Sequence, residues 1–258
     1  IKPSVILPQL SNMGLEGKRL VEESLFLREP ILLKYAGRIK EVLPYILPVA
    51  DQLIGEVFTE EDRKLTHMYR AILRLVAHGK NTYGEIKGSF EKKGGPVISG
   101  YLDNLVRMGL LKKVRIWRSR RVFYRHFSPI TDLYYYSIAK YEEIRPEVVE
   151  VKIPKYVEWF FEDLFSEIFN LRPVKILNPE IDIALVKFNR LEFVGEVKWK
   201  DRVSGKEIRE VEEKLSRFDC KRILIVPEES GLEGETGLEV WDVKRISEEV
   251  EKEKRKRG

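Results

Sequence analysis

Charged side chains interrupt two apolar runs between residues 180 and 200. Asp182 lies in the first run, and Glu196 and Lys198 lie two residues apart in the second. A charged group inside an apolar strand must be paired, solvated or bound to a metal, because burying an isolated charge costs too much free energy. Carboxylate oxygens are the ligands that Mg²⁺ prefers, and a neighbouring lysine could orient a water or a phosphate. We therefore expect Asp182 and Glu196 to hold Mg²⁺ or Mn²⁺, with Lys198 as a catalytic residue beside them.

The two runs that carry these residues have the composition of β-strands. Residues 181–188 and 191–199 are joined by the short polar turn Asn189-Arg190, which predicts a β-hairpin. Because side chains alternate across a strand, Glu196 and Lys198 are expected on one face of the second strand. The Glu-x-Lys spacing also occurs elsewhere in this chain, in which 34% of the residues are charged. The alternative interpretation is a surface hairpin whose charges form ordinary ion pairs.

A helix with an apolar face is predicted before the hairpin, from about residue 155 to residue 169. Its aromatic and aliphatic side chains recur at helical spacing, which is typical of a helix packed on a core. Glu162, or Glu158 one turn earlier, is expected to point from the edge of this helix toward the hairpin, and we assign Glu162 a catalytic role through a water. The remaining elements are expected to be a charged helix over residues 204–218, strands over residues 222–226 and 238–243, and a charged terminal helix over residues 243–257.

Another group of elements comes earlier in the chain. Helix caps and apolar spacing, with Thr82 and Glu85 as a capping box, predict three short helices over residues 59–79, 82–90 and 96–109. Two strand-like runs follow, over residues 110–117 and 121–128. Three short helices followed by a hairpin are the order of a winged helix-turn-helix. The prolines between residues 146 and 154 indicate a linker between this group and the next.

Positive charge is concentrated in residues 59–128. This segment has 16 Lys and Arg against 6 Asp and Glu, a net charge of +10, whereas the whole chain carries +5. Such a segment favours contact with nucleic acid, because each phosphate that it neutralises releases counterions. The alternatives are that the module docks proteins, or that its hairpin is merely solvated. The hairpin residues expected to contact double-stranded DNA are Lys112, Lys113, Arg115, Arg118, Arg120, Arg121 and Arg125.

Bulk properties limit the class of protein. A length of 258 residues predicts about two domains, and a pI near 9.0 permits nucleic-acid binding. The single cysteine, Cys220, excludes an internal disulfide and a Cys-rich zinc site, so we expect a reducing, cytoplasmic location. No apolar run approaches the ~20 residues of a membrane span, so no membrane is expected as a partner. Abundant Glu, Lys and Arg resemble the composition of thermophile proteins.

The order helix, strand, strand with Asp, strand with Glu-x-Lys, helix, strand resembles the restriction-endonuclease-like, or PD-(D/E)xK, nuclease superfamily. The residues that match are Glu162, Asp182, Glu196 and Lys198, and Ile181 stands before Asp182 where the superfamily motif has proline. This resemblance implies a metal-dependent nuclease core within residues 155–245.

The two halves together resemble the C-terminal part of the archaeal AAA-type ATPase family, a winged helix followed by an endonuclease-like domain of unknown function. The stretches YRAILRLVAHGKNTYGEI, YLDNLVRMGLLKKV and Phe161-Glu162-Asp163-Leu164 carry this resemblance. It implies an ATPase partner, as a domain upstream or as a separate subunit, with residues 1–58 as a remnant of the ATPase lid. Residues 14–19 lack Walker A spacing, so no ATP site is expected in this chain. A chain that begins with Ile1 instead of Met is expected to be a fragment.

We therefore expect a mixed α+β or α/β protein in three parts: a helical segment (1–58), a winged helix-turn-helix domain (59–145) and a restriction-endonuclease-like αβββαβ domain (155–258). The leading hypothesis is a DNA-binding protein with a metal-dependent nuclease domain that hydrolyses phosphodiester bonds. One alternative is a catalytically silent platform that works with an ATPase. Another is a winged-helix regulator whose C-terminal domain forms a homodimer.

Overall fold

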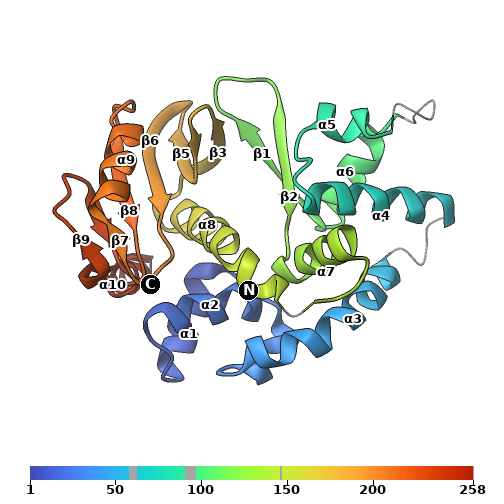
Figure 1. Ribbon diagram of the computed structural model, residues 1–258, viewed down its shortest axis with the longest axis horizontal. Helices are drawn as coiled ribbons and strands as arrows, with labels where there is room; N and C mark the ends of the chain where they lie inside the picture. The colour runs from blue at the N-terminus through green and yellow to red at the C-terminus, as the bar shows by residue number, and fades with distance from the viewer. Residues whose placement is uncertain (58–62, 91–96, 146, 258) are drawn as a thin grey trace. The chain divides into compact units, whose positions relative to one another are not determined.

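The chain is a mixed α and β protein with many helices and a multi-stranded mixed sheet (Figure 1). The computed structural model describes residues 1–57, 63–90, 97–145 and 147–257. It divides into two compact units. The first unit joins Ile1–Ile39 to Ile153–Gly258, and the second unit is Lys40–Lys152. These divisions differ from the expected boundaries, because the first 39 residues belong with the C-terminal part of the chain.

The sheet of the first unit has antiparallel strands at one side and parallel strands at the other. Strands β3, β5 and β6 pair antiparallel, β6, β8 and β10 pair parallel, and β4 pairs with β3 beyond a turn with a cis Asn178-Pro179 peptide bond. A separate parallel pair joins β7 to β9. The strands are β3 (Arg172–Leu177), β4 (Glu180–Ile181), β5 (Ile183–Lys187), β6 (Arg190–Val197), β7 (Val203–Ser204), β8 (Lys221–Ile225), β9 (Leu232–Glu233) and β10 (Glu239–Trp241).

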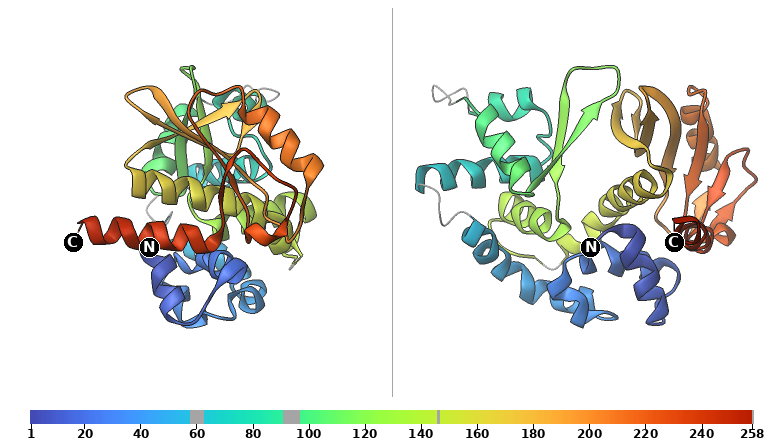
Figure 2. Two further views of the ribbon diagram at one scale, coloured as in Figure 1. Left: turned by 90° about the vertical axis from the view of Figure 1, so that its left-hand side faces the viewer. Right: turned by 180° about the vertical axis from the view of Figure 1, so that it is seen from behind.

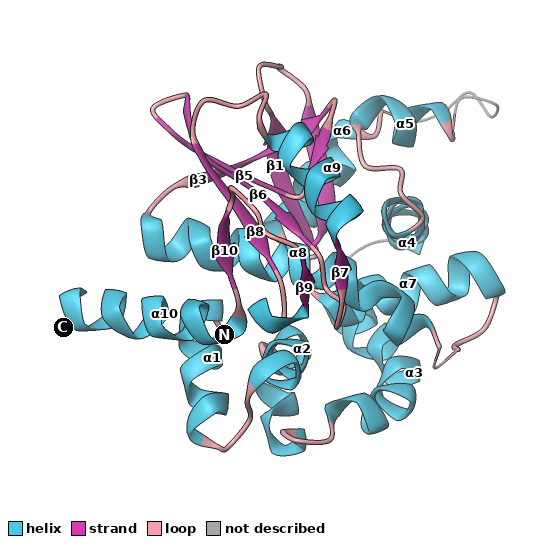
Figure 3. Ribbon diagram, turned by 60° about the vertical axis from the view of Figure 1, so that its left-hand side comes forward, coloured by secondary structure: helices cyan, strands magenta, loops and turns pink. Residues whose placement is uncertain are grey.

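Helices α8 (Val148–Phe169) and α9 (Gly205–Leu215) cover opposite faces of this sheet (Figure 3). The ring of Phe165 on α8 lies 5.3 Å from that of Phe193 on β6, measured between centroids. Three residues further along β6, and therefore on the other face, Glu196 pairs with Lys214 of α9. The apolar face of α9, with Ile208, Val211 and Leu215, is buried. The core of the first unit thus lies on both sides of β6.

Residues 1–39 pack on this core through helices α1 (Pro3–Asn12) and α2 (Gly17–Leu27) and the short 3-10 helix η1 (Pro30–Tyr35). The guanidinium of Arg28 pairs with Asp163 of α8 at 3.0 Å. The indole nitrogen of Trp199, just after β6, donates a hydrogen bond of 2.9 Å to Glu22 of α2. The terminal helix α10 (Val243–Arg257) contacts α1 and α2 (Figure 2). The N-terminal helices are therefore part of the first unit and not a separate segment.

The second unit combines several helices with one β-hairpin. Its core is aromatic and aliphatic, with Tyr69, Leu73, Leu102, Leu105 and Tyr135 among its fully buried residues. The elements are α3 (Ile39–Val57, which begins in the first unit), α4 (Arg63–Ala77), α5 (Tyr83–Gly88), α6 (Ser99–Arg107), β1 (Leu111–Ile116), β2 (Val122–His126) and α7 (Pro129–Tyr141).

Local signals predicted these elements to within a few residues of their observed ends. The capping box of Thr82 and Glu85 is confirmed at the start of α5, and Thr82 also forms an isolated antiparallel bridge to Phe123 of β2. The expected first residues of the first and third helices, Thr59 and Pro96, lie outside the described residues. The order of helices and strands in residues 63–126 is as predicted.

Two local predictions are wrong. The turn between β5 and β6 is Phe188-Asn189, one residue earlier than expected, since Lys187 pairs with Arg190 and both turn residues have positive φ, 46° and 62°. Such angles define the type I′ turn, whose twist matches that of the flanking strands. The expected linker at residues 146–154 also fails, because α8 begins at Val148 and continues through Pro154. A proline removes one helical hydrogen bond, but Val148, Val149 and Ile153 are buried and hold this first part of the helix in place.

No helix within the described residues is both long enough and apolar enough to cross a membrane.

Candidate functional site

Seven charged side chains of the first unit form one group, which we call the charged cluster. They come from segments between residue 155 and residue 214 that meet at this place. These segments are α8, β3, β4, the residue between β4 and β5, β6 and α9. The members are Lys155, Glu158, Lys175, Glu180, Asp182, Glu196 and Lys214.

Asp182 and Glu196 lie side by side, as the sequence predicted. Each carboxylate accepts a hydrogen bond from the backbone next to the other: the amide of Val197 donates to Asp182 Oδ2 at 2.9 Å, and the amide of Asp182 donates to Glu196 Oε1 at 3.3 Å. Asp182 falls in the gap between β4 and β5, where the backbone leaves the ladder and its amide becomes available. This gap positions the pair.

Glu196 is almost completely buried, at 3% exposure. Burial raises the pKa of its carboxyl, and the neighbouring charge of Asp182 raises it further. Lys214 of α9 opposes both effects, because its Nζ lies 2.6 Å from Glu196 Oε2. Helix α9 is fixed at its start by a capping box of Ser204 and Glu207. Lys214 was not among the site residues predicted from the sequence. Its position next to the buried Leu215 of an amphipathic helix could have indicated that it lies close to the sheet.

Glu158 of α8 interacts with Asp182. Burial raises its pKa to about 7, and the charge of Asp182 adds to this rise, while Lys155, 2.6 Å away, and Lys175 oppose it. Lys175 is buried, lies 3.1 Å from Glu180 and donates a hydrogen bond of 3.2 Å to the carbonyl of Ile181. Of the two helix carboxylates predicted to point toward the hairpin, Glu162 and Glu158, it is on Glu158 that the charge of Asp182 is seen to act.

Glu162 lies one helical turn beyond Glu158 and is buried, at 5% exposure. Lys198 follows the end of β6, where its backbone amide donates to the carbonyl of Ile225 at 2.8 Å. Its side chain is half-buried and forms no ion pair within the described part of the chain. Of the four residues predicted for the site, the structure therefore joins Asp182 and Glu196 directly by hydrogen bonds.

The carboxylate oxygens of Asp182 and Glu196 are the groups of this site that could bind a metal ion. No group of three or more His, Cys, Asp or Glu side chains among the described residues is arranged to hold a metal ion. Mg²⁺ can be bound by one or two protein carboxylates when waters and substrate phosphates complete its shell. Asp182 and Glu196 supply two adjacent carboxylates whose mutual repulsion a cation would relieve. The pair therefore fits a hard divalent cation shared with a phosphate and does not fit a cage made of protein ligands alone.

The basic hairpin of the second unit presents most of its charge to solvent. Lys113 and Arg115 on β1 and Arg118, Arg120 and Arg121 in the turn are exposed, and Lys112 is half-buried. Lys113 lies 3.7 Å from Asp103 of α6. Arg118 has its guanidinium carbon 5.7 Å from the ring centroid of Trp117.

Arg125 differs from the other hairpin residues. Its side chain is 3% exposed, so it is not a surface charge. Residues 124 to 126 are all buried, so this end of β2 does not follow the usual alternation of buried and exposed side chains, and β2 contacts both α4 and α7. We leave Arg125 out of the proposed nucleic-acid interface.

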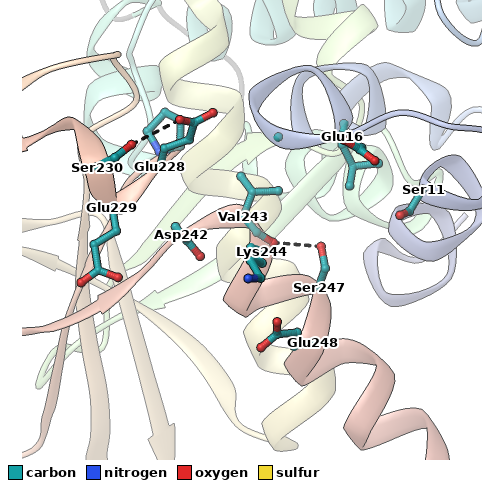
Figure 4. A pocket seen from close by; sticks show the side chains of 13 residues that line it. Ser11, Glu16, Glu228, Glu229, Ser230, Asp242, Val243, Lys244, Ser247 and Glu248 are labelled. Atoms are coloured by element: carbon teal, nitrogen blue, oxygen red, sulfur yellow. Dashed lines mark hydrogen bonds between the residues drawn. The ribbon is translucent and has the colours of Figure 1, made fainter.

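The first unit also contains a pocket of about 560 Å³, formed by the start of α2, the loop after β8 and the start of α10 (Figure 4). Asp242 in this pocket accepts a hydrogen bond from the amide of Arg245 at 2.8 Å and so caps α10. An acidic lining repels phosphate, and we assign no nucleic acid to this pocket. The charged residues of its lining are Glu16, Glu228, Glu229, Asp242, Lys244 and Glu248.

Comparison with known proteins found no family model that matches this sequence, and no curated protein or solved structure that is similar to it.

Proposed function

We propose that the chain is a nucleic-acid-binding protein whose charged cluster is the site of a metal-dependent phosphodiesterase, with DNA as its substrate. The observation that carries this proposal is the reciprocal hydrogen bonding of Asp182 and Glu196, which holds two carboxylates together at a break in the sheet. Two carboxylates beside several lysines are the groups that a cation and a phosphate require. The winged-helix and nuclease resemblance of the sequence supports the same proposal.

Each residue of the site has a distinct task in this proposal. Asp182 and Glu196 hold the cation, and Lys198 orients the attacking water or neutralises charge on the phosphate. A divalent cation bound there supplies a Lewis acid that polarises the phosphoryl oxygen and lowers the pKa of a bound water. We assign the role of the helix carboxylate to Glu158, because the charge of Asp182 acts on it.

The exposed hairpin arginines would bring the nucleic acid to the protein. Arg118, Arg120 and Arg121 form a compact patch in the turn between β1 and β2. Contacts from such residues go to phosphates, so they supply affinity and orientation without reading the base sequence. Binding is expected to weaken steeply with salt, because it depends on counterion release.

The first experiment tests catalysis apart from binding. Labelled linear and branched DNA is incubated with the protein and Mg²⁺, Mn²⁺ or EDTA, beside the Asp182→Asn variant. Asparagine keeps an oxygen for the amide of Val197 but removes the charge, so the fold is retained. We expect cleavage only with metal and only by the parent protein, with DNA affinity within about twofold in both. Equal cleavage by the variant would remove Asp182 from the mechanism.

The second experiment tests the hairpin. Replacing Arg118, Arg120 and Arg121 together by alanine should lower DNA affinity and reduce the slope of log K against log salt by about 2 to 3, at ~0.9 per lost phosphate contact. The matched control removes three lysines from α10, Lys252, Lys254 and Lys256. An unchanged salt slope in the hairpin variant would show that the nucleic acid binds elsewhere.

A catalytically silent platform that works with an ATPase is the second candidate function. It is favoured by the ion pair of Lys214 with Glu196 and by the lack, within the described residues, of a third carboxylate arranged to hold a metal. Metal-independent DNA binding without any cleavage would favour this candidate.

A further inference from the structure

Lys214 binds a carboxylate oxygen of Glu196 that the proposed function assigns to a metal ion. Its Nζ lies 2.6 Å from Oε2, a distance typical of a strong charge-assisted hydrogen bond. The other oxygen of Glu196, Oε1, accepts the amide of Asp182 at 3.3 Å. Both oxygens of this buried carboxylate are therefore engaged. A Mg²⁺ ion, which binds oxygen at ~2.0–2.1 Å, must therefore compete for Oε2 with the ammonium group, which also repels it.

Each lysine of the charged cluster forms an ion pair with at least one of its carboxylates. Lys155 pairs with Glu158, Lys175 with Glu180, and Lys214 with Glu196. Lys155 also lies 3.8 Å from Glu180. The carboxylate of Asp182 forms no ion pair within the described part of the chain, and it accepts a hydrogen bond from the backbone amide of Val197. This carboxylate lies next to the Lys214–Glu196 pair, because the amide of Asp182 donates a hydrogen bond to Glu196.

Lys214 is able to leave. Its side chain is 29% exposed, whereas that of Glu196 is 4% exposed, so the ammonium group has a route to solvent and the carboxylate does not. Lys214 lies in the last turn of α9, and a lysine stem has four flexible carbons. The charge of Lys214 also lowers the pKa of Glu180, which is exposed, so Glu180 attracts the ammonium group.

We propose that the ammonium group of Lys214 is an internal cation that occupies the metal position at Glu196, so that the Lys214–Glu196 ion pair closes the site until a divalent cation displaces it. This inference rests on the proposed function, since it concerns the same carboxylates. It makes Lys214 a residue that sets metal affinity, with its ammonium group moving to Glu180 or to a substrate phosphate on displacement.

The test measures binding of Mn²⁺ alone, by calorimetry, to the parent protein and to Lys214→Gln. Glutamine removes the charge but can still donate to Glu196, so the buried carboxylate is not stranded. We expect Mn²⁺ to bind Lys214→Gln about tenfold more tightly or better, since a hydrogen bond to a charged group is at stake. Mn²⁺ should also raise the melting temperature of this variant more than that of the parent.

Lys206→Gln is the matched control, because Lys206 lies on the same helix, is exposed and pairs only weakly with Glu210 at 3.8 Å. This control should bind Mn²⁺ as the parent does, and Glu196→Gln should abolish the gain that Lys214→Gln produces. Equal Mn²⁺ affinity in the parent and Lys214→Gln would overturn the role of Lys214 while leaving a metal site intact. No Mn²⁺ binding by either protein would overturn both this inference and the metal-dependent function.

Discussion

Gly195, the residue before Glu196, is where an added methyl group would disturb the site most directly. Gly195 lies in the middle strand β6, opposite Ile183 of β5 on one side and Ile223 of β8 on the other. A Cβ atom built there would lie 2.8 Å from Cγ1 and 3.3 Å from Cδ1 of Ile223. Carbon atoms pack best at about 3.5–4.0 Å, so the closest contact is short by roughly 1 Å.

Ile223 cannot easily give way, because it is fully buried. We therefore expect Gly195→Ala to lower the free energy of unfolding of the first unit by about 1–3 kcal/mol, the usual cost of overpacking a core. Ile223→Ala alone leaves a cavity and should cost about 2–5 kcal/mol. In the double variant the added methyl group enters that cavity. Its measured loss of stability should therefore be smaller, by at least ~1 kcal/mol, than the sum of the losses in the two single variants.

The assay is urea unfolding followed by tryptophan fluorescence. Three of the four tryptophans, Trp159, Trp199 and Trp241, lie in the first unit, so a Trp117→Phe background makes the signal specific to that unit. Fully additive losses in the double variant would refute the steric reasoning. A loss below ~0.5 kcal/mol for Gly195→Ala would show that β6 and β8 separate at little cost.

Two further predictions concern buried polar groups. Trp199→Phe removes the indole donor to Glu22 and should destabilise the first unit by about 1.5–3 kcal/mol in the same urea assay; unchanged stability would mean that residues 1–39 are not held by this bond. His126 is fully buried, and burial lowers its pKa below the ordinary 6.5 despite the opposing charge of Asp132. The unfolded chain then binds the proton more readily than the folded one. The free energy of unfolding of the second unit should therefore keep its full value above pH 6.5 and decrease as the pH falls below 6.5, by up to ~1.4 kcal/mol per pH unit. His126→Gln should remove this slope, whereas the exposed His78→Gln should retain it, and a slope that persists in His126→Gln would contradict the assignment.

Local sequence signals predicted local structure well. The capping box at Thr82, the N-cap at Ser204 and the extent of the terminal helix from Val243 follow from side chains within one or two turns of each boundary. The packing of residues 1–39 against α8 was not predictable in this way. It depends on the contact of Arg28 with Asp163, which is 135 positions away in the sequence, and on that of Trp199 with Glu22, which is 177 positions away. The periodicity of a single segment cannot predict such contacts.

The candidate site shows the same limit. Alternation along a strand was enough to predict that Asp182 and Glu196 belong together. Helical periodicity left Glu158 and Glu162 equivalent, because both lie on one face of α8, and only the tertiary fold selects the turn that approaches Asp182. Lys214 belongs to one of the Glu-x-Lys repeats that carry no information as tripeptides, and its role follows from how α9 lies on the sheet.

The charges of the cluster determine the order in which ligands can approach it. Four carboxylates and three lysines leave the fully ionised cluster with one excess negative charge, most of it surrounded by low-dielectric core. A phosphodiester is repelled by such a site. A divalent cation changes this net charge from −1 to +1 when the ammonium group of Lys214 leaves Glu196 but stays within the cluster, where that ammonium group can meet the phosphate. Because the attraction of the phosphate depends on that reversal, cation binding should precede productive DNA binding at the cluster, while contact at the basic hairpin needs no cation.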